Sequence, residues 1–155
     1  GLCTIAAAKY IGCEVDLLAK YDHQNEAGSK LGAGIVDGLY DRVVDCVGSN
    51  ETLNKSARTA KPGSWIVLLG IPMEGINLPG MKVIMNEIKI FPSIMYGSTS
   101  GIKDFEVAAK LLSIFPAIGE TLITHRFSLD DAKEAFKVAQ DKSYDCIKVV
   151  FDPNI

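Results

Sequence analysis

Residues 40–72 constrain the fold more than any other stretch of the sequence. Two short apolar, β-branched runs flank a segment with helical spacing at residues 50–60. Each run is followed by a glycine, Gly48 after the first and Gly70 after the second. This pattern predicts a strand, a crossover helix and a second strand parallel to the first. Ligands bind parallel sheets outside the carboxyl ends of the strands, so the two glycines mark the first place to look for a site.

The rest of the chain also alternates between helical and extended patterns. A proline inside one expected strand, Pro92, indicates an edge strand or a bulge. Ser128 is the expected N-cap of the last helix. Alternating elements predict an α/β fold with a doubly wound parallel sheet. The expected helices cover residues 1–12, 24–31, 80–87, 104–114 and 128–141, and the further expected strands cover residues 14–19, 34–37, 88–95, 122–124 and 147–151.

Composition excludes several classes of partner. The 155 residues are 48% hydrophobic, which is enough for the core of one ordinary domain. A net charge of -3 with no basic block argues against nucleic-acid binding. No apolar run approaches the roughly 20 residues that cross a bilayer. Residues 1–8 lack the pattern of a signal peptide, so we expect no membrane partner.

Cysteine and histidine usage argues against a metal site. None of the cysteines forms a C-x-x-C pair, and the histidines do not cluster with them. We therefore expect no metal site, and free, mostly buried thiols in a reducing cytosol, which predicts a cytoplasmic protein. The residues concerned are Cys3, Cys13, Cys46, Cys146, His23 and His125.

Several segments, in order along the whole chain, carry a resemblance to one family. Residues 1–4 look like the end of a G-x-G-x-x-G turn, and residues 40–49 (YDRVVDCVGS) resemble a characteristic strand. Residues 61–72, 122–127 and 147–150 match later segments. Together they resemble the C-terminal portion of the medium-chain, zinc-type alcohol dehydrogenases.

The resemblance implies a Rossmann-like doubly wound sheet in truncated form. The family's N-terminal catalytic domain, its first nucleotide-binding strand and its first two fingerprint glycines have no counterpart in the sequence. Residues 1–96 would form an incomplete dinucleotide-binding domain. Residues 97–155 would be the segment that packs back on the catalytic domain in the family. The sheet could be rearranged, completed by a partner or left incomplete. A homo-oligomer through the edge at residues 88–96 is expected.

The resemblance also assigns residues to the cofactor's adenosine and phosphate groups. Gly1 would let a helix N-terminus approach the pyrophosphate. Ala19 stands where the family usually has an acidic residue for the ribose hydroxyls of NAD. Lys20 could pair with a 2′-phosphate and Tyr21 could pack on the adenine, so we expect NADP rather than NAD. A nearby carboxyl, Asp22, and an ordinary solvated turn are the opposing interpretations.

A second set of residues would serve the nicotinamide half. Asp45 and His125 are interpreted as structural. His23 is interpreted as a surface residue, with a place near the adenosine phosphate as the alternative. Ordinary turn chemistry at the glycines, and an exposed lysine on an edge strand for the pyrophosphate residue, remain the alternatives. The expected contacts are Val47, Gly48, Gly70 and Ile71 with the ribose and nicotinamide, Ser93 and Met95 with the nicotinamide amide through their backbone, and Lys148 with the pyrophosphate.

The leading functional hypothesis is the cofactor-binding portion of an oxidoreductase. Its parent protein would move a hydride between NAD(P)(H) and an alcohol or carbonyl compound, with zinc bound by the parent but not by this chain. No catalytic residue is expected here, and the chain alone should be inactive. The alternatives are a noncatalytic nucleotide-binding or interaction module, and part of a zinc-free quinone reductase-like enzyme.

Overall fold

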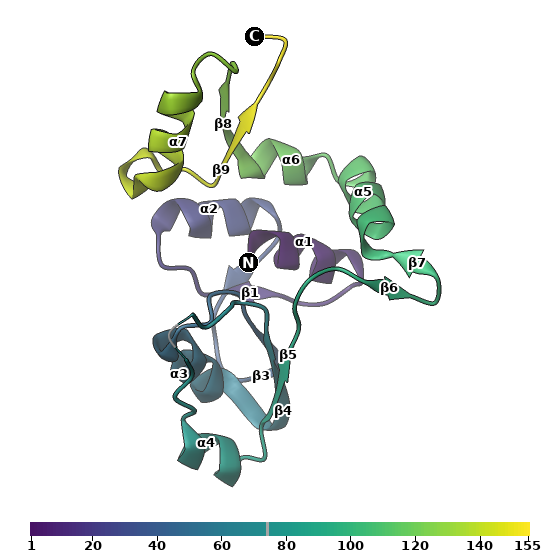
Figure 1. Cartoon of the computed structure of the whole chain (residues 1–155). Coiled ribbons are helices and arrows are strands. Elements are labelled where there is room, and N and C mark those ends of the chain that lie inside the picture. Colours follow the sequence, from purple (N-terminus) through teal and green to yellow (C-terminus); the bar gives the residue numbers. More distant parts are fainter. Residues whose placement is uncertain (74) are drawn as a thin grey trace. The chain divides into compact units, whose positions relative to one another are not determined.

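A computed structural model describes residues 1–73 and 75–155, apart from the side chain of Lys142 (Figure 1). The chain divides into two compact units. Gly1 and residues 37–98 form the first unit, and residues 2–36 and 99–155 form the second. The expected boundary between residues 96 and 97 stays a prediction. Between the strand–helix–strand segment at residues 40–72 and the helix expected over residues 80–87, Glu74 lies outside the described residues.

The first unit contains the strand–helix–strand pattern that the sequence predicts. Strand β3 pairs with β4, and β4 pairs with β5, both in parallel. Strand β5 is therefore an edge strand, which confirms the expectation from Pro92. Helix α3 follows β3, and helix α4 precedes β5. The bounds are β3 Tyr40–Asp45, α3 Asn50–Thr59, β4 Ala60–Leu68, α4 Gly80–Met85 and β5 Lys89–Pro92.

The register brings the carboxyl ends of these three strands to one edge. Asp45 at the end of β3 lies opposite Leu68, which lies opposite Pro92 in β5. At the start of β3 the register shifts, because residues 61–64 of β4 bulge out. Lys61 in this bulge donates to a carboxylate oxygen of Asp41 at 2.8 Å. This hydrogen bond and the lysine charge lower the pKa of Asp41.

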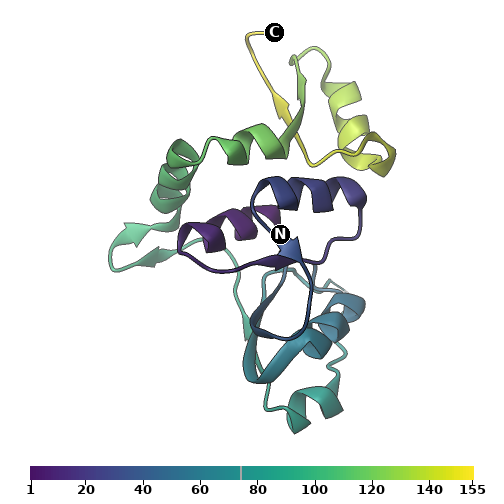
Figure 2. The same cartoon turned by 180° about the vertical axis from the view of Figure 1, so that it is seen from behind.

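One face of the sheet packs against helix α3. The helix presents Leu53 and Ala57, four residues apart and hence on the same side, to Ile66 of β4. Ala60 and Ile88 complete this core, and none of the five is more than 6% exposed. The helix lies beside β3 and β4 in both views of the molecule, Figures 1 and 2. Because α3 packs on β3 and β4 through this core, the loop between β3 and α3 is held at both ends.

The second unit is built from shorter elements. Strands β1 and β2 pair in parallel, as do β8 and β9. Helices α1 and α2 run side by side, and α7 lies beside β8 and β9 (Figures 1 and 2). Ala6, Ile118 and Leu122 form the core between α1 and α6. The bounds are α1 Leu2–Tyr10, β1 Asp16–Leu17, α2 Asp22–Lys30, β2 Gly34–Ile35, β7 Ile102–Lys103, α5 Asp104–Ile114, α6 Ala117–Leu122, β8 Ile123–Phe127, α7 Ala132–Gln140, the 3₁₀ turn Lys142–Tyr144 and β9 Lys148–Phe151, with β6 Ser98–Thr99 pairing with β7.

The α/β class with parallel sheets is confirmed, and two local expectations are wrong. Helix α7 begins at Ala132 rather than after Ser128. Ser128 donates its hydroxyl to the carboxylate of Asp131 at 2.7 Å, and this local bond takes the place of helix capping. The cysteines are free as expected, but Cys3 and Cys13 are exposed and the other two are half-buried. Cys3 lies within α1 but away from its buried residues, Ile5 and Ala6, and Cys13 follows the helix.

The first unit's core gives a direct stability test. Leu53 is 2% exposed, so Leu53→Ala leaves a cavity and should lower the free energy of unfolding by about 2–5 kcal/mol. Leu78→Ala is the matched control in the same unit, because Leu78 is 56% exposed. The control should cost less than about 0.5 kcal/mol. Urea unfolding followed by Trp65 fluorescence measures both, and equal losses would contradict this core.

Candidate functional site: two glycine loops

The loops after β3 and β4 touch through their backbones. A Cβ added to Gly48 would lie 2.6 Å from both the carbonyl carbon and oxygen of Gly70. A Cβ added to Gly70 would come closer still to the backbone of Val47 and Gly48. Gly48 also has φ +77°, which side chains disfavour. The close approach therefore requires glycine on both sides.

Asp45 fixes the first of these loops through its side chain. It is only 3% exposed. Its Oδ1 accepts from the N–H of Val47 at 2.9 Å and of Gly48 at 3.0 Å. Its Oδ2 accepts from the hydroxyl of Thr52 at 2.9 Å, which ties the loop to the first turn of α3. The carboxylate thus has three donors and needs no contact with water.

The backbone of the same residue fixes the second loop. The carbonyl oxygen of Asp45 accepts from the N–H of Leu69 at 2.8 Å and of Gly70 at 3.0 Å. One residue therefore holds both loops, with its side chain on one and its backbone on the other. The sequence interpretation of Asp45 as structural missed this link. A carboxyl side chain at a strand end, two residues before a loop amide, was the available signal.

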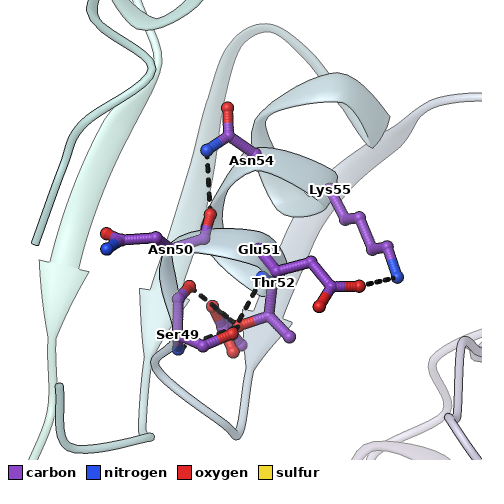
Figure 3. Close-up of polar contacts among 7 residues, drawn as sticks. Ser49, Asn50, Glu51, Thr52, Asn54 and Lys55 are labelled. Atoms are coloured by element: carbon purple, nitrogen blue, oxygen red, sulfur yellow. Dashed lines mark hydrogen bonds and ion pairs between the residues drawn. The ribbon is translucent and has the colours of Figure 1, made fainter.

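Helix α3 begins with a closed capping box, which Figure 3 shows. The N–H of Thr52 donates to the hydroxyl oxygen of Ser49, and the N–H of Ser49 donates to that of Thr52, both at 3.1 Å. One turn further on, Lys55 pairs with Glu51 at 2.7 Å. The N–H groups of Ser49 and Thr52 at the helix start are thus satisfied by side chains.

Hydrogen bonding determines what the loops can offer a ligand. The engaged N–H groups cannot cradle a phosphate, which needs several free amides pointing at it. The loop carbonyl oxygens are acceptors, and they suit ligand donors such as hydroxyl or carboxamide groups. The N–H groups already taken within the protein are those of Val47, Gly48, Ser49, Leu69 and Gly70.

Other expected residues lie near this edge of the first unit. The side chains of Val47 and Ile71 are exposed beside the glycines. Ser93 continues the pairing of β5, since its N–H donates to the carbonyl of Leu68 at 2.9 Å. Met95 is exposed and has φ +66°. A Cβ added to Gly1 would lie 4.0 Å from Cβ of Cys46, the residue after Asp45.

The expected adenosine residues lie in the second unit, around a hollow of about 390 Å³. Lys20 Nζ stands 5.6 Å from the ring centre of Tyr21. The ring of His23 stacks on the same tyrosine ring, with the two ring centres 5.6 Å apart. His23 Nδ1 pairs with Asp145 at 2.9 Å. With 12% side-chain exposure His23 is not a surface residue, so that expectation is wrong. Asp22, Glu26 and Asp145 also line the hollow.

Sequence reasoning missed Asp145 because it is remote in the chain from Lys20, Tyr21 and His23. Two other residues, Lys148 and His125, both bond the hydroxyl of Thr124. Lys148 in β9 is exposed, and its N–H and carbonyl both bond the hydroxyl of Thr124. His125 Nδ1 bonds the same hydroxyl at 2.9 Å. Ala19 connects β1 to Lys20 without being fully exposed.

A model of the family described as zinc-binding dehydrogenases matches residues 1–113. The chain belongs to this family. Mouse sorbitol dehydrogenase (Mus musculus) is similar to it, with 25% identity over 150 residues, 97% of this chain and 40% of that protein. The chain thus spans less than half the length of the relatives that it matches.

Solved structures share the fold of this chain. An E. coli CFT073 alcohol dehydrogenase complexed with NADH superposes with a TM-score of 0.78 at 21% identity, covering 97% of this chain and 48% of that one. Staphylococcus aureus TarJ in complex with NADPH superposes with a TM-score of 0.75 at 22% identity, covering 96% of this chain and 50% of that one. At these identities the likeness concerns the fold alone.

The metal in the family's name does not fit the described residues. Within residues 1–73 and 75–155, no three His, Cys, Asp or Glu side chains lie close enough together to hold a metal ion. A dinucleotide fits better, because the Gly48–Gly70 contact leaves backbone, not side chains, at the carboxyl ends of the strands.

In the same described residues no helix is long and apolar enough to span a membrane.

The glycine contact predicts a graded pair of substitutions. Gly48→Ala adds a steric clash to an unfavourable φ and should lower the free energy of unfolding by more than about 3 kcal/mol. Gly63→Ala is the matched control: its φ is +72°, but nothing lies within 4 Å of the added Cβ. It should cost only about 1–2 kcal/mol. Thermal or urea unfolding measures both, and equal losses would contradict the close approach.

Proposed function

We propose that this chain is the cofactor-binding portion of an oxidoreductase that transfers a hydride between NAD(P)(H) and an alcohol or carbonyl compound. The observation that carries the proposal is the pair of glycine loops at the carboxyl ends of β3 and β4. The cofactor supplies the hydride chemistry, and the protein binds and orients it. Membership of the zinc-binding dehydrogenase family supports this assignment.

The loops of the first unit suit the nicotinamide half of the cofactor. Their carbonyl oxygens can accept from ribose hydroxyls and from the carboxamide NH₂, whereas their engaged amides would not bind phosphate. Val47 and Ile71 place exposed apolar side chains beside the glycines, where a planar ring could pack. Ser93 and Met95 follow the end of β5 at Pro92, and their backbones would add contacts to the nicotinamide amide.

In the second unit, the hollow around Lys20 and Tyr21 suits the adenosine half. Lys20 is a cation for a 2′-phosphate, and Tyr21 offers a ring face for adenine. We therefore propose NADP as the preferred cofactor. The carboxylates of Asp22 and Glu26 favour the ribose hydroxyls of NAD instead, which makes NAD the second candidate.

Further features of the whole protein belong to the same proposal. Gly1 and Lys148 would face the pyrophosphate. The substrate, which could be a polyol, and any zinc would be held by residues of the parent protein outside this chain. The chain alone should therefore not oxidise alcohols. Zinc-dependent alcohol oxidation by the purified chain would contradict this assignment. A homodimer would form through the β5 edge, and a cytoplasmic location stays a prediction.

Cofactor titration tests the proposal and the choice of nucleotide. The purified chain should bind NADPH more tightly than NADH, measured by nucleotide fluorescence. Lys20→Met removes the cation and should weaken NADPH binding about tenfold, which corresponds to about 1.4 kcal/mol. Binding of NADH should stay within about twofold, because NADH has no 2′-phosphate.

Lys30→Met provides the matched control, since Lys30 is an exposed lysine at the end of α2, the helix that begins two residues after Lys20. It should leave both affinities unchanged. Tighter binding of NADH than NADPH would favour the second candidate, NAD. Binding of neither nucleotide would overturn the proposed function.

A further inference from the structure

We propose that Asp45 is a positioning residue for the cofactor: its carboxylate holds the first glycine loop in the form that contacts the nicotinamide half. This inference rests on the proposed function. It gives a role in binding to a residue that lies behind the loops and contacts no ligand itself. Only 3% of Asp45 is exposed, so an effect on binding must pass through the loops.

The first step is that the carboxylate determines the loop conformation. Gly48 has φ +77°, a conformation that a free loop leaves readily because glycine has many alternatives. Two adjacent amides, Val47 and Gly48, point back at the same oxygen of Asp45. Without that acceptor both amides would need other partners, and the loop would rearrange to find them.

The second step is that the first loop determines the second. The backbone of Gly48 lies against Gly70 so closely that no Cβ fits between them. Leu69 and Gly70 in turn donate to the backbone carbonyl of Asp45. A shift of the first loop therefore opens the contact that keeps both sets of carbonyl oxygens in place. The carboxylate acts on the second loop only through this contact.

The third step concerns charge and shape. The other carboxylate oxygen accepts from Thr52, which also belongs to the capping box of α3. An Asp45→Asn side chain can still accept from the two loop amides through its carbonyl oxygen. Its NH₂ group can donate to the hydroxyl oxygen of Thr52, which can reverse its role. Asn should therefore preserve the loops, whereas Ala should not.

The experiment measures two probes and one conformational signal in the 155-residue chain. The probes are NADPH and adenosine 2′,5′-bisphosphate, which lacks the nicotinamide half. Asp45→Ala should weaken NADPH binding by about tenfold or more and leave the bisphosphate within about twofold. Asp45→Asn should restore NADPH binding to within about threefold. Amide hydrogen exchange at Val47 and Gly48 should accelerate in Asp45→Ala and stay slow in Asp45→Asn.

Leu53→Ala serves as the control for lost stability, because the Leu53 side chain lies in the same unit's core and takes no part in the hydrogen bonds of Asp45. At a temperature where all variants are folded, it should leave NADPH binding and the exchange of Val47 and Gly48 unchanged. Thr52→Val covers the case in which Asp45→Ala fails to fold. It removes one partner of the carboxylate and should weaken NADPH binding but not bisphosphate binding.

Each contrary outcome has a distinct meaning. If the unaltered chain binds neither NADPH nor NADH, the proposed function falls and this inference with it. If the unaltered chain binds NADPH but Asp45→Ala and Thr52→Val bind it equally well, the inference alone is wrong. Equal weakening of NADPH and the bisphosphate, matched by Leu53→Ala, would assign Asp45 a purely structural role and also overturn it.

Discussion

The contact between the backbones of Gly48 and Gly70 is the constraint on which the rest of this chain's site depends. It exists because β3 and β4 are parallel neighbours whose carboxyl ends coincide, and because neither loop carries a side chain at the point of approach. Asp45 stabilises the contact from behind, with its carboxylate on one loop and its carbonyl on the other. A single buried residue thus links the sheet register to the shape of the loops.

The two units offer a ligand different chemistry. In the first, the engaged amides leave carbonyl oxygens, which accept hydrogen bonds from hydroxyl and amide groups. In the second, Lys20, Tyr21 and a set of carboxylates surround an open hollow. His23, held by Asp145 and stacked on Tyr21, restricts the ring that would receive an adenine. Under the proposed function, the first unit would serve the nicotinamide half of the cofactor and the second unit the adenosine half.

Much of the first unit is predictable from sequence, because strong β-branched runs, a helical segment and two glycines agree with one another. The second unit is less so: β1 and β2 are two residues long, and α6 has six residues with a central Gly119, too few for a periodic signal. The glycines of the site were found from their place after strands. The role of Asp45 was not found, because its place at a strand end indicates a possible bond to a loop amide but not which amides its carboxylate accepts from.

Chemical-shift mapping with half-cofactors tests the central claim most directly. Nicotinamide mononucleotide, added at millimolar concentration to ¹⁵N-labelled chain, should shift the amides of Val47, Gly48, Gly70 and Ile71 and leave those of Lys20 and Tyr21 in place. Adenosine 2′,5′-bisphosphate should do the reverse. Shifts at Lys20 with nicotinamide mononucleotide, or none at the glycine loops, would contradict the account.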